Sequence, residues 1–362
     1  MVDETFKCAF LEHGVTFYSD GMVGPCCQID YNYREPNEHI RDKNRFSNIK
    51  ENYKEACKTC LNAERKGLKS YRQSQDKFYN DNKLRYLDIR TTNKCNLICR
   101  MCDPFYSDKW GKELNVKNPL VQVDISEFDD IVFSDDVKWI YFTGGEPLIN
   151  PKHWEILQVL VDSGKSKHIQ LQYNTNMTTA KYKKIDIFTL WSQFKSVFVL
   201  GSIDAIGKEL EYIRSGAKWE TIDKHINVFN EYKNSTSPDF DFIFEIHLTL
   251  TIMNIWSIEK ILDYFNKLNI KVNVQILTGP DILALNVIPD SLQQEALDIL
   301  YKVKSANPEV FSSAISEVKN NINKVLFEKT MLFTILLDNK RNEDLFNLLP
   351  VSDEATKTVG SR

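Results

Sequence analysis

Three cysteines within one short run are the side chains whose spacing points most clearly to chemistry. Cys95, Cys99 and Cys102 lie in the run Cys-Asn-Leu-Ile-Cys-Arg-Met-Cys, which has the pattern C-x3-C-x2-C. Three closely spaced thiolates can each hold one iron of a cubane [4Fe–4S] cluster and leave the fourth iron without a protein ligand. An open iron can bind a substrate or a second cofactor, so the pattern predicts a reaction centre.

Zinc binding and disulfide formation are the alternatives for these cysteines. A structural zinc ion usually takes four protein ligands, and the residues that follow, Asp103-Pro104-Phe105, include no Cys or His. A disulfide is disfavoured because the three cysteines share one short loop and three is an odd number. The spacing therefore favours an open cluster over a zinc site.

Two predicted strands position this loop. The alternating run 84–91 is typical of a strand and ends just before Cys95. Residues 137–143 form a second apolar strand, which ends in Thr-Gly-Gly-Glu-Pro. The two glycines, Gly144 and Gly145, would let a ligand approach the backbone closely.

The cysteine motif after one strand and Gly-Gly-Glu-Pro after the next resemble the radical S-adenosylmethionine (radical SAM) superfamily. The resemblance implies that Cys95, Cys99 and Cys102 are catalytic, holding a [4Fe–4S] cluster to which S-adenosylmethionine binds. It implies cleavage of this cofactor to a 5′-deoxyadenosyl radical, with the protein supplying placement and shielding. Lys94 and Arg100 add positive charge near the cluster, and they either tune its potential or end in solvent.

The resemblance also assigns a cofactor pocket. Gly144, Gly145 and Glu146 are implied to contact the methionyl amino group, and the backbone of Met101 to contact the adenine, with core packing as the alternative for Met101. Asn176 ends the third strand, where Met177 stands in place of the family's glycine and leaves the turn geometry open.

The end of the fourth strand and the helix after it supply the rest of this pocket. Ser202 is implied to meet the ribose or the carboxylate of the cofactor. Asp204 belongs to the same motif, with a helix N-cap as its alternative role. A guanidinium is suited to a carboxylate, so Arg214 is the candidate for the cofactor carboxylate, with a surface ion pair as the alternative. The six histidines are scattered and are interpreted as structural.

The order of elements predicts an α/β fold, namely a partial (β/α)6 TIM-like barrel with a cysteine-rich N-terminal domain and C-terminal helices. The expected domains are 1–80, 81–280 and 281–362. The expected strands are 84–91, 137–143, 168–175, 196–203, 241–251 and 270–277. The expected helices are 151–163, 178–193, 219–233, 256–268, 290–305, 308–324 and 326–348. The acidic segment 115–135 is expected to be a surface helix or an insertion, and the tail 352–362 to be frayed.

The N-terminal cysteines form a second candidate metal site. Cys8, Gly21 and Cys26 read C-x12-G-x4-C, and Cys57 and Cys60 supply C-x2-C. This spacing resembles the twitch domain, a short form of the SPASM domain, although the family usually places it after the barrel. The resemblance implies an auxiliary Fe–S cluster, [4Fe–4S] in type, on Cys8, Cys26, Cys57 and Cys60, and four-cysteine zinc is the alternative.

Cys27 is left over from both cysteine sets. Its possible roles are a spare thiol, an alternative ligand, a small buried residue or a hydrogen-atom donor to a substrate radical. Of these, the inert role is favoured.

Composition bounds the class of protein. The chain has 362 residues, 42% of them hydrophobic, and a net charge of −4, which gives no argument for nucleic acid or membrane partners. It shows neither a signal peptide pattern nor an apolar run of membrane-spanning length. Eight cysteines in a chain of this size indicate metal or redox chemistry in a reducing cytoplasm.

The sequence therefore predicts a radical SAM oxidoreductase or maturase that abstracts hydrogen from its substrate and uses the second cluster as an electron relay. The resemblance to twitch proteins favours oxidation, crosslinking or epimerisation of a peptide or protein. The alternative is a dehydrogenase of a small molecule such as an amino sugar or cyclitol, and the distant alternative is a non-catalytic zinc-binding scaffold. An external flavodoxin-like or ferredoxin-like electron donor is implied.

Overall fold

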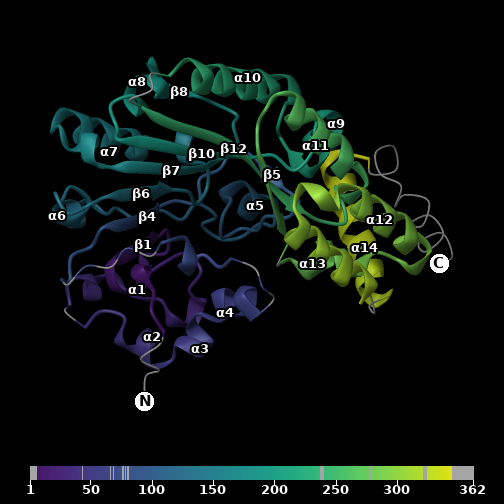
Figure 1. Cartoon of the computed structure of the whole chain (residues 1–362), viewed down its shortest axis with the longest axis horizontal. Helices are drawn as coiled ribbons and strands as arrows, with labels where there is room; N and C mark the ends of the chain where they lie inside the picture. The colour runs from purple at the N-terminus through teal and green to yellow at the C-terminus, as the bar shows by residue number, and fades with distance from the viewer. Residues whose placement is uncertain are drawn as a thin grey trace.

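A nine-stranded sheet organises this computed structural model (Figure 1). The structure describes residues 6–42, 44–65, 67, 69–75, 77, 79, 81–236, 240–277, 279–320 and 324–344. The strand order is β13-β12-β10-β7-β6-β4-β1-β2-β3. Six consecutive parallel strands form the barrel-like part: β4 (Tyr86–Arg90), β6 (Trp139–Phe142), β7 (Gln170–Thr175), β10 (Ser196–Ser202), β12 (Asp241–Leu250) and β13 (Val272–Ile276). These are the six expected strands, so the predicted mixed α/β fold of the partial TIM-like class is confirmed.

Helices connect the parallel strands and continue beyond them. Along the barrel they are α5 (Asp108–Glu113), α6 (Asp129–Val132), α7 (Pro151–Asp162), α8 (Ile187–Trp191), α9 (Gly207–Ile213), α10 (Trp219–Ser235) and α11 (Ile258–Lys267). The C-terminal helices are α12 (Asp290–Val303), α13 (Pro308–Lys319) and α14 (Lys324–Arg341). In the described residues no helix is long and apolar enough to cross a membrane.

The two faces of the sheet differ in polarity because side chains alternate along each strand. On the outer face, Tyr173 and Phe244 lie against Trp191 of α8 and Phe229 of α10. Figure 1 shows α8 and α10 above β10 and β12, and α1 to α4 below β1. The inner face is more polar. On this face Asp88 of β4 is paired with Tyr141 of β6, which is paired in turn with Gln172 of β7. Polar groups that can meet a ligand therefore line the inner face.

The N-terminal segment continues the same sheet. Strand β1 (Gly14–Tyr18) pairs in parallel with β4, and β2 (Met22–Gly24) and β3 (Glu35–Pro36) follow in antiparallel pairing. The helices of this segment are α1 (Ala9–His13), α2 (Ser47–Glu51), α3 (Tyr53–Ala56) and α4 (Lys58–Arg65). The expected boundary near residue 80 thus divides neighbouring strands of one sheet, and the domain division stays a prediction.

The expected helix 178–193 is wrong over its first half. Residues 181–186 form the small hairpin of β8 (Lys181–Tyr182) and β9 (Ile185–Asp186), and Lys183 turns it with a φ of 54°. Asp186 then caps α8 by accepting a hydrogen bond from the Phe188 backbone N–H at 3.1 Å. The segment 115–135 is an insertion that contains the 3-10 helix η4 (Ser126–Phe128) and the short helix α6. The tail 352–362 lies outside the described residues.

Candidate functional site

The cysteine loop and the Gly-Gly-Glu-Pro loop lie in direct contact. The backbone N–H of Gly145 donates to the Thr92 carbonyl at 3.0 Å, and that of Glu146 donates to the Lys94 carbonyl at 2.8 Å. A Cβ atom on Gly145 would collide with this Lys94 carbonyl. Gly144 has a φ of 107°, which favours glycine. The two glycines therefore permit the loop that begins at Cys95 to rest on the end of β6.

The backbone of the cysteine loop is held from several sides. Asp108 accepts a hydrogen bond from the Cys95 N–H at 2.9 Å, and the Trp110 indole donates to the Cys99 carbonyl at 2.7 Å. Cys99 lies on β5 (Ile98–Cys99), which pairs with β11 (Arg214–Ser215), so that Cys99 is directly opposite Arg214. Two short strands thus bring a thiol and a guanidinium together.

Arg214 is aimed at the cysteines by Asp204. Its Nη1 lies 3.7 Å from the Cys99 sulfur, and its Nε and Nη2 lie 2.7 and 2.6 Å from Asp204 Oδ2. Asp204 is fully buried and also accepts the Thr249 N–H at 2.8 Å. Burial would lower the pKa of Arg214, but Asp204 and Cys99 outweigh it and hold the pKa above its usual value. The alternatives of a surface ion pair for Arg214 and a helix N-cap for Asp204 are wrong, since both are buried and Ile206 occupies the N-cap of α9.

Glu146 places a buried carboxylate beside Cys95. The residue is 2% exposed, and its carboxylate accepts hydrogen bonds from Thr175 Oγ1 at 2.8 Å, the Asn176 N–H at 2.7 Å and the Leu148 N–H at 3.1 Å. Burial raises the pKa of Glu146 to about 7 despite these bonds. A cationic ligand at this carboxylate would relieve the desolvation cost of its charge.

Glu146 is expected to make the cofactor-free protein less stable as the pH rises. Because its folded pKa is about 7 against an ordinary 4.5, the folded state binds the proton more tightly. Its stabilising contribution is present below pH 4.5 and is lost as the pH rises through 7, about 3 kcal/mol in all. Urea unfolding of wild type and Glu146→Gln across this pH range measures the difference, and parallel pH curves for the two proteins would contradict the assignment.

Asn176 and Met177 form the turn after β7. Asn176 Nδ2 donates to Asn96 Oδ1 at 2.8 Å and lies 3.9 Å from the Cys95 sulfur. Met177 has a φ of 59°, so methionine adopts the left-handed conformation that glycine would take more easily. Its side chain is fully buried, and its sulfur fills the space that a Cβ on Gly201 would need. The chain therefore forms this turn with methionine in place of glycine, and the absence of a side chain on Gly201 leaves room for the Met177 side chain.

Met177→Gly is expected to destabilise the protein by about 2 kcal/mol. Loss of a buried methionine side chain lowers the free energy of unfolding by about 2–5 kcal/mol. Glycine adopts the left-handed conformation without steric strain, which raises the free energy of unfolding by roughly 1–2 kcal/mol. Gly201→Ala alone should also destabilise, because the new methyl group meets the Met177 sulfur. The double variant should cost less than the sum of the two single changes, since the methyl group then enters vacated space. Denaturant unfolding of all four proteins tests this, and strict additivity would contradict the packing argument.

Ser202 and Met101 lie at the same end of the barrel. Ser202 ends β10, is partly exposed and stands opposite His247 of β12. Met101 is partly buried and packs against the core, so its assigned backbone contact with adenine remains a prediction.

His247 was interpreted from the sequence as structural, yet it lies on the inner face near this site. Its Nε2 is 3.0 Å from Gln275 Oε1. Burial lowers its pKa, and Asp204 and Arg214 are close enough to act on it electrostatically. A lone histidine gave no sequence signal, because only the strand register reveals its neighbours.

The N-terminal cysteines gather into one group. Burial raises the pKa of Cys57 to about 12, with further contributions from Cys8 and Cys60. Burial also raises the pKa of Cys26, to which Cys27, Cys8 and Cys60 add. Cys26 and Cys57 thus each lie close enough to Cys8 and Cys60 to act on them electrostatically, and all eight cysteines are free.

Cys27, which follows Cys26, lies close to charged residues of β4. Its pKa is raised to about 11, first by burial, with opposing effects of Arg90 and Asp88 on the inner face of β4. Oδ2 of Asp88 has no hydrogen-bond partner in the described part of the chain. Cys27 is therefore close both to Cys26 and to the charged residues of β4.

Both cysteine sets have the chemistry of iron–sulfur sites. Three free thiols beside the cation Arg214 suit an anionic cluster with an open iron, and four neighbouring free thiols suit a fully ligated one. Among the described residues, no three His, Cys, Asp or Glu side chains converge as the ligands of a single metal ion would. A cubane takes each thiolate at a different corner, so the ligands of such a cluster need not converge on one point.

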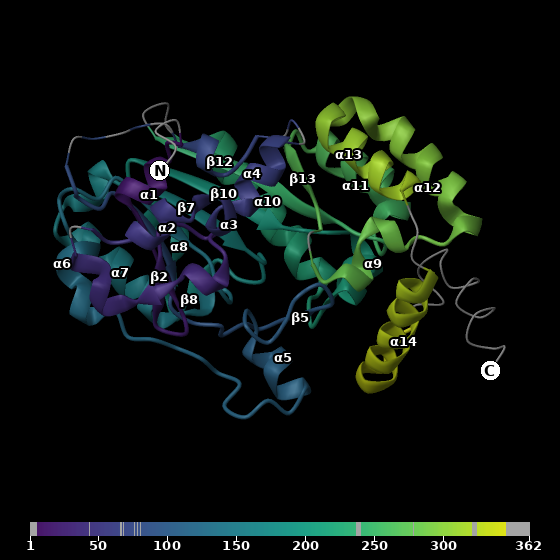
Figure 2. The same cartoon turned by 90° about the horizontal axis from the view of Figure 1, so that it is seen from below.

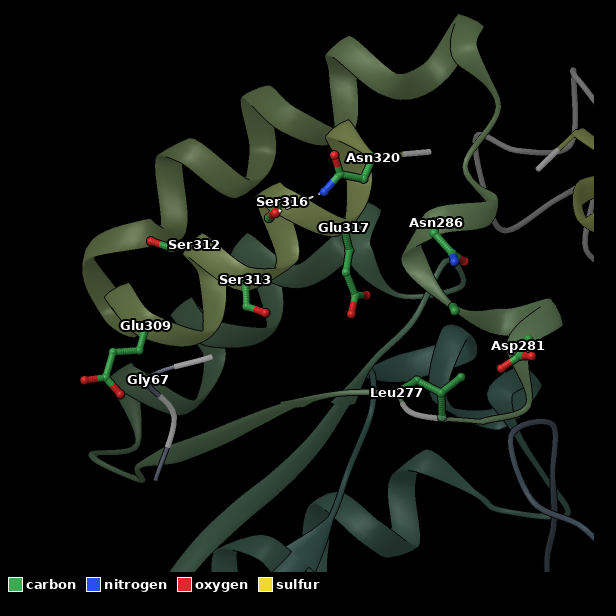
Figure 3. A pocket seen from close by; sticks show the side chains of 11 residues that line it. Gly67, Leu277, Asp281, Asn286, Glu309, Ser312, Ser313, Ser316, Glu317 and Asn320 are labelled. Carbon is green, nitrogen blue, oxygen red and sulfur yellow. Dashed lines mark hydrogen bonds between the residues drawn. The ribbon is translucent and has the colours of Figure 1, made fainter. Parts of the chain in front are cut away.

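A separate open cavity lies beside the edge of the sheet (Figure 3). It has a volume of about 820 Å³ and is lined by the end of β13, the turns after it, α13 and Gly67 beyond α4. Asp281, Glu309 and Glu317 are among its lining residues, and none of the predicted site residues lines it. Its size is within the range of ligand pockets.

The comparisons with known proteins agree with this site. Residues 89–265 match the family model of the Radical SAM superfamily. The chain is 37% identical over 79 residues to 7-carboxy-7-deazaguanine synthase of Thermoplasma acidophilum, covering 22% of this chain and 34% of that protein. It is 35% identical over 91 residues to GTP 3′,8-cyclase of Campylobacter fetus, covering 25% and 27%. The chain thus spans about a third or less of the length of these relatives.

Solved structures with related folds include two S-adenosylmethionine complexes. The structure of anSMEcpe with bound AdoMet and Cp18Cys peptide aligns with a TM-score of 0.41 and 18% identity, covering 64% of this chain and 61% of that one. SuiB of Streptococcus suis bound to S-adenosylmethionine aligns with a TM-score of 0.39 and 14% identity, covering 82% and 70%.

Residues 89–265 of this chain are thus similar to the radical SAM superfamily.

Proposed function

We propose that this protein is a radical SAM oxidoreductase or maturase that modifies a peptide or protein and carries an auxiliary iron–sulfur cluster. The observation that supports it is the presence of two cysteine groups joined by one continuous sheet: Cys95, Cys99 and Cys102 follow β4, while Cys8 and Cys26 flank β1 and β2 beside it. The resemblance of the N-terminal spacing to twitch domains supports a peptide substrate.

In this proposal, each candidate residue has a role. Cys95, Cys99 and Cys102 hold the cluster, and when bound, S-adenosylmethionine and this cluster supply the 5′-deoxyadenosyl radical that abstracts a hydrogen atom from the substrate. Glu146 binds the methionyl ammonium, and this cation stabilises the ionised form of the buried Glu146 carboxylate. Arg214, held by Asp204, faces the carboxylate.

The remaining residues shape the pocket and connect it to electrons. Gly144 and Gly145 give the cofactor room, Asn176 orients the loop, Ser202 binds the ribose, and Met101 lies against the adenine. Cys8, Cys26, Cys57 and Cys60 hold the auxiliary cluster as an electron relay. An external electron donor of the flavodoxin or ferredoxin class reduces the protein in the cytoplasm. The protein has three proposed domains, which are residues 1–80, 81–280 and 281–362.

Metal content and cofactor cleavage test this proposal. Anaerobically reconstituted protein is expected to hold about eight irons, as two [4Fe–4S] clusters require, and to form 5′-deoxyadenosine from S-adenosylmethionine under a reductant. The variant with alanine at 95, 99 and 102 should keep about half of the iron and form none. The variant with alanine at 8, 26, 57 and 60 should keep the other half and still cleave the cofactor. A colourless, zinc-loaded protein would instead support the scaffold alternative.

A small molecule is the second candidate substrate. It is favoured by the curated relatives, whose names are those of a synthase and a cyclase. Incubation of the active enzyme with separated peptide and metabolite fractions of its source cells distinguishes the two, because only one fraction should yield a product by mass spectrometry.

A further inference from the structure

Arg100 lies between two candidate cluster ligands but points away from them. It is fully buried, and its Nη2 is 2.5 Å from both Asp338 Oδ1 and Glu343 Oε2. Its Nε donates to the Tyr212 carbonyl at 3.0 Å, and its guanidinium lies 3.7 Å above the Tyr212 ring. The expectation that Arg100 ends in solvent is therefore wrong, and its tuning of the cluster stays a prediction. Its charge is met at the C-terminal end of α14.

Arg341 makes the reciprocal contact from α14 to the cysteine loop. Its Nη1 donates to the Ile98 carbonyl at 3.1 Å and to Ser215 Oγ at 3.0 Å. Its Nε and Nη2 bind the two Glu113 carboxylate oxygens at 2.9 and 2.6 Å. Ile98 precedes Cys99, and Ser215 follows Arg214, so one guanidinium contacts both strands of the β5–β11 pair.

These contacts converge on the strand pair that carries the middle cysteine and the candidate carboxylate-binding arginine. Ring stacking of Trp110 on Phe333, with centroids 6.4 Å apart, adds an apolar contact between α5 and α14. Figure 2 shows α5, β5 and α14 on the same side of the molecule. A buried charge that loses its partner is strongly unfavourable, so the loop can keep this position only while α14 is docked.

We propose that α14 is part of the S-adenosylmethionine site, with Arg100, Asp338 and Arg341 as positioning residues for Cys99 and Arg214. This inference rests on the proposed assignment of Cys95, Cys99 and Cys102 as cluster ligands. Among the residues that the structure describes, no hydrogen bond or ion pair joins the four-cysteine group to these residues, so its cluster serves as an internal reference.

The test compares Asp338→Asn and Arg341→Met with Lys329→Met, an exposed residue of the same helix. Iron content and the change in the electron paramagnetic resonance spectrum of the reduced protein on adding S-adenosylmethionine are measured. Both test variants are expected to keep the auxiliary cluster and to bind S-adenosylmethionine at least tenfold more weakly, or to lose the spectral change. Asp338→Glu, which keeps the charge, should restore much of the response. Hydrogen exchange of residues 96–102 should increase in the metal-free test variants and not in the control.

The outcomes separate this inference from the proposed function. Wild-type binding of the cofactor by Asp338→Asn and Arg341→Met would overturn the positioning role and leave the proposed function intact. Loss of both clusters together with a large fall in melting temperature would also overturn it, because the effect would then be global. Wild-type protein without iron at the three-cysteine loop would refute the proposed function itself.

Discussion

Asp204→Ala is expected to abolish binding of S-adenosylmethionine and to destabilise the protein by about 3–5 kcal/mol, as removal of one partner of a buried ion pair does. Asp204 holds Arg214 through two contacts to one carboxylate oxygen and accepts the Thr249 N–H with the other. Without it, a buried guanidinium lies unpaired beside Cys99 and a backbone donor loses its acceptor. Denaturant unfolding and titration of S-adenosylmethionine into the reconstituted protein measure the two effects.

Two further variants separate charge from packing at this position. Asp204→Asn keeps an oxygen for Thr249 but removes the charge, so it should stabilise the fold relative to alanine without restoring the cofactor. Asp290→Ala changes an exposed aspartate at the start of α12 and should alter stability by less than about 1 kcal/mol. Unchanged cofactor affinity in Asp204→Ala would show that Arg214 is not oriented by this contact.

Gly145→Ala is expected to disrupt the cysteine loop, at a cost of about 3 kcal/mol or more. The new methyl group would collide with the Lys94 carbonyl, and this carbonyl is a backbone atom fixed by its hydrogen bond from Glu146. Overpacking of this kind costs about 1–3 kcal/mol where side chains can adjust, and here no side chain can move aside. The three-cysteine loop should lose its iron, while the four N-terminal cysteines keep theirs.

Gly279→Ala is the matched control for this change. Apart from its chain neighbours, no atom of the described residues lies within 4 Å of the position that a Cβ would occupy, so the iron content of this variant should equal that of wild type. Full iron loading of Gly145→Ala would contradict the argument that the two motifs depend on a side-chain-free contact.

The parallel strands could be predicted from the sequence because each is a short apolar run that ends near a chemically distinct residue. The cofactor candidates could also be predicted, since Glu146, Asn176 and Asp204 all follow strand ends. The helix expected at 178–193 failed because the hairpin depends on Lys183 adopting a left-handed turn, which side-chain polarity does not reveal.

Contacts between distant parts of the chain could not be predicted. Arg100 reads as an exposed charge until α14 brings Asp338 to it. His247 and Cys27 gain their surroundings only from strand register and from the pairing of β1 with β4. Such neighbours are set by tertiary packing, and no local pattern records them.

The pairing of β1 with β4 has a consequence for the order in which the molecule can be assembled. During synthesis the first cysteines emerge well before residues 86–90, yet β1 has no parallel neighbour until those residues are available. Until β4 has been synthesised, β1 therefore has one strand edge without its hydrogen-bonding partner. Iron delivery to Cys8 and Cys26 should accordingly follow translation of β4, and a fragment that stops at residue 80 should fail to retain metal.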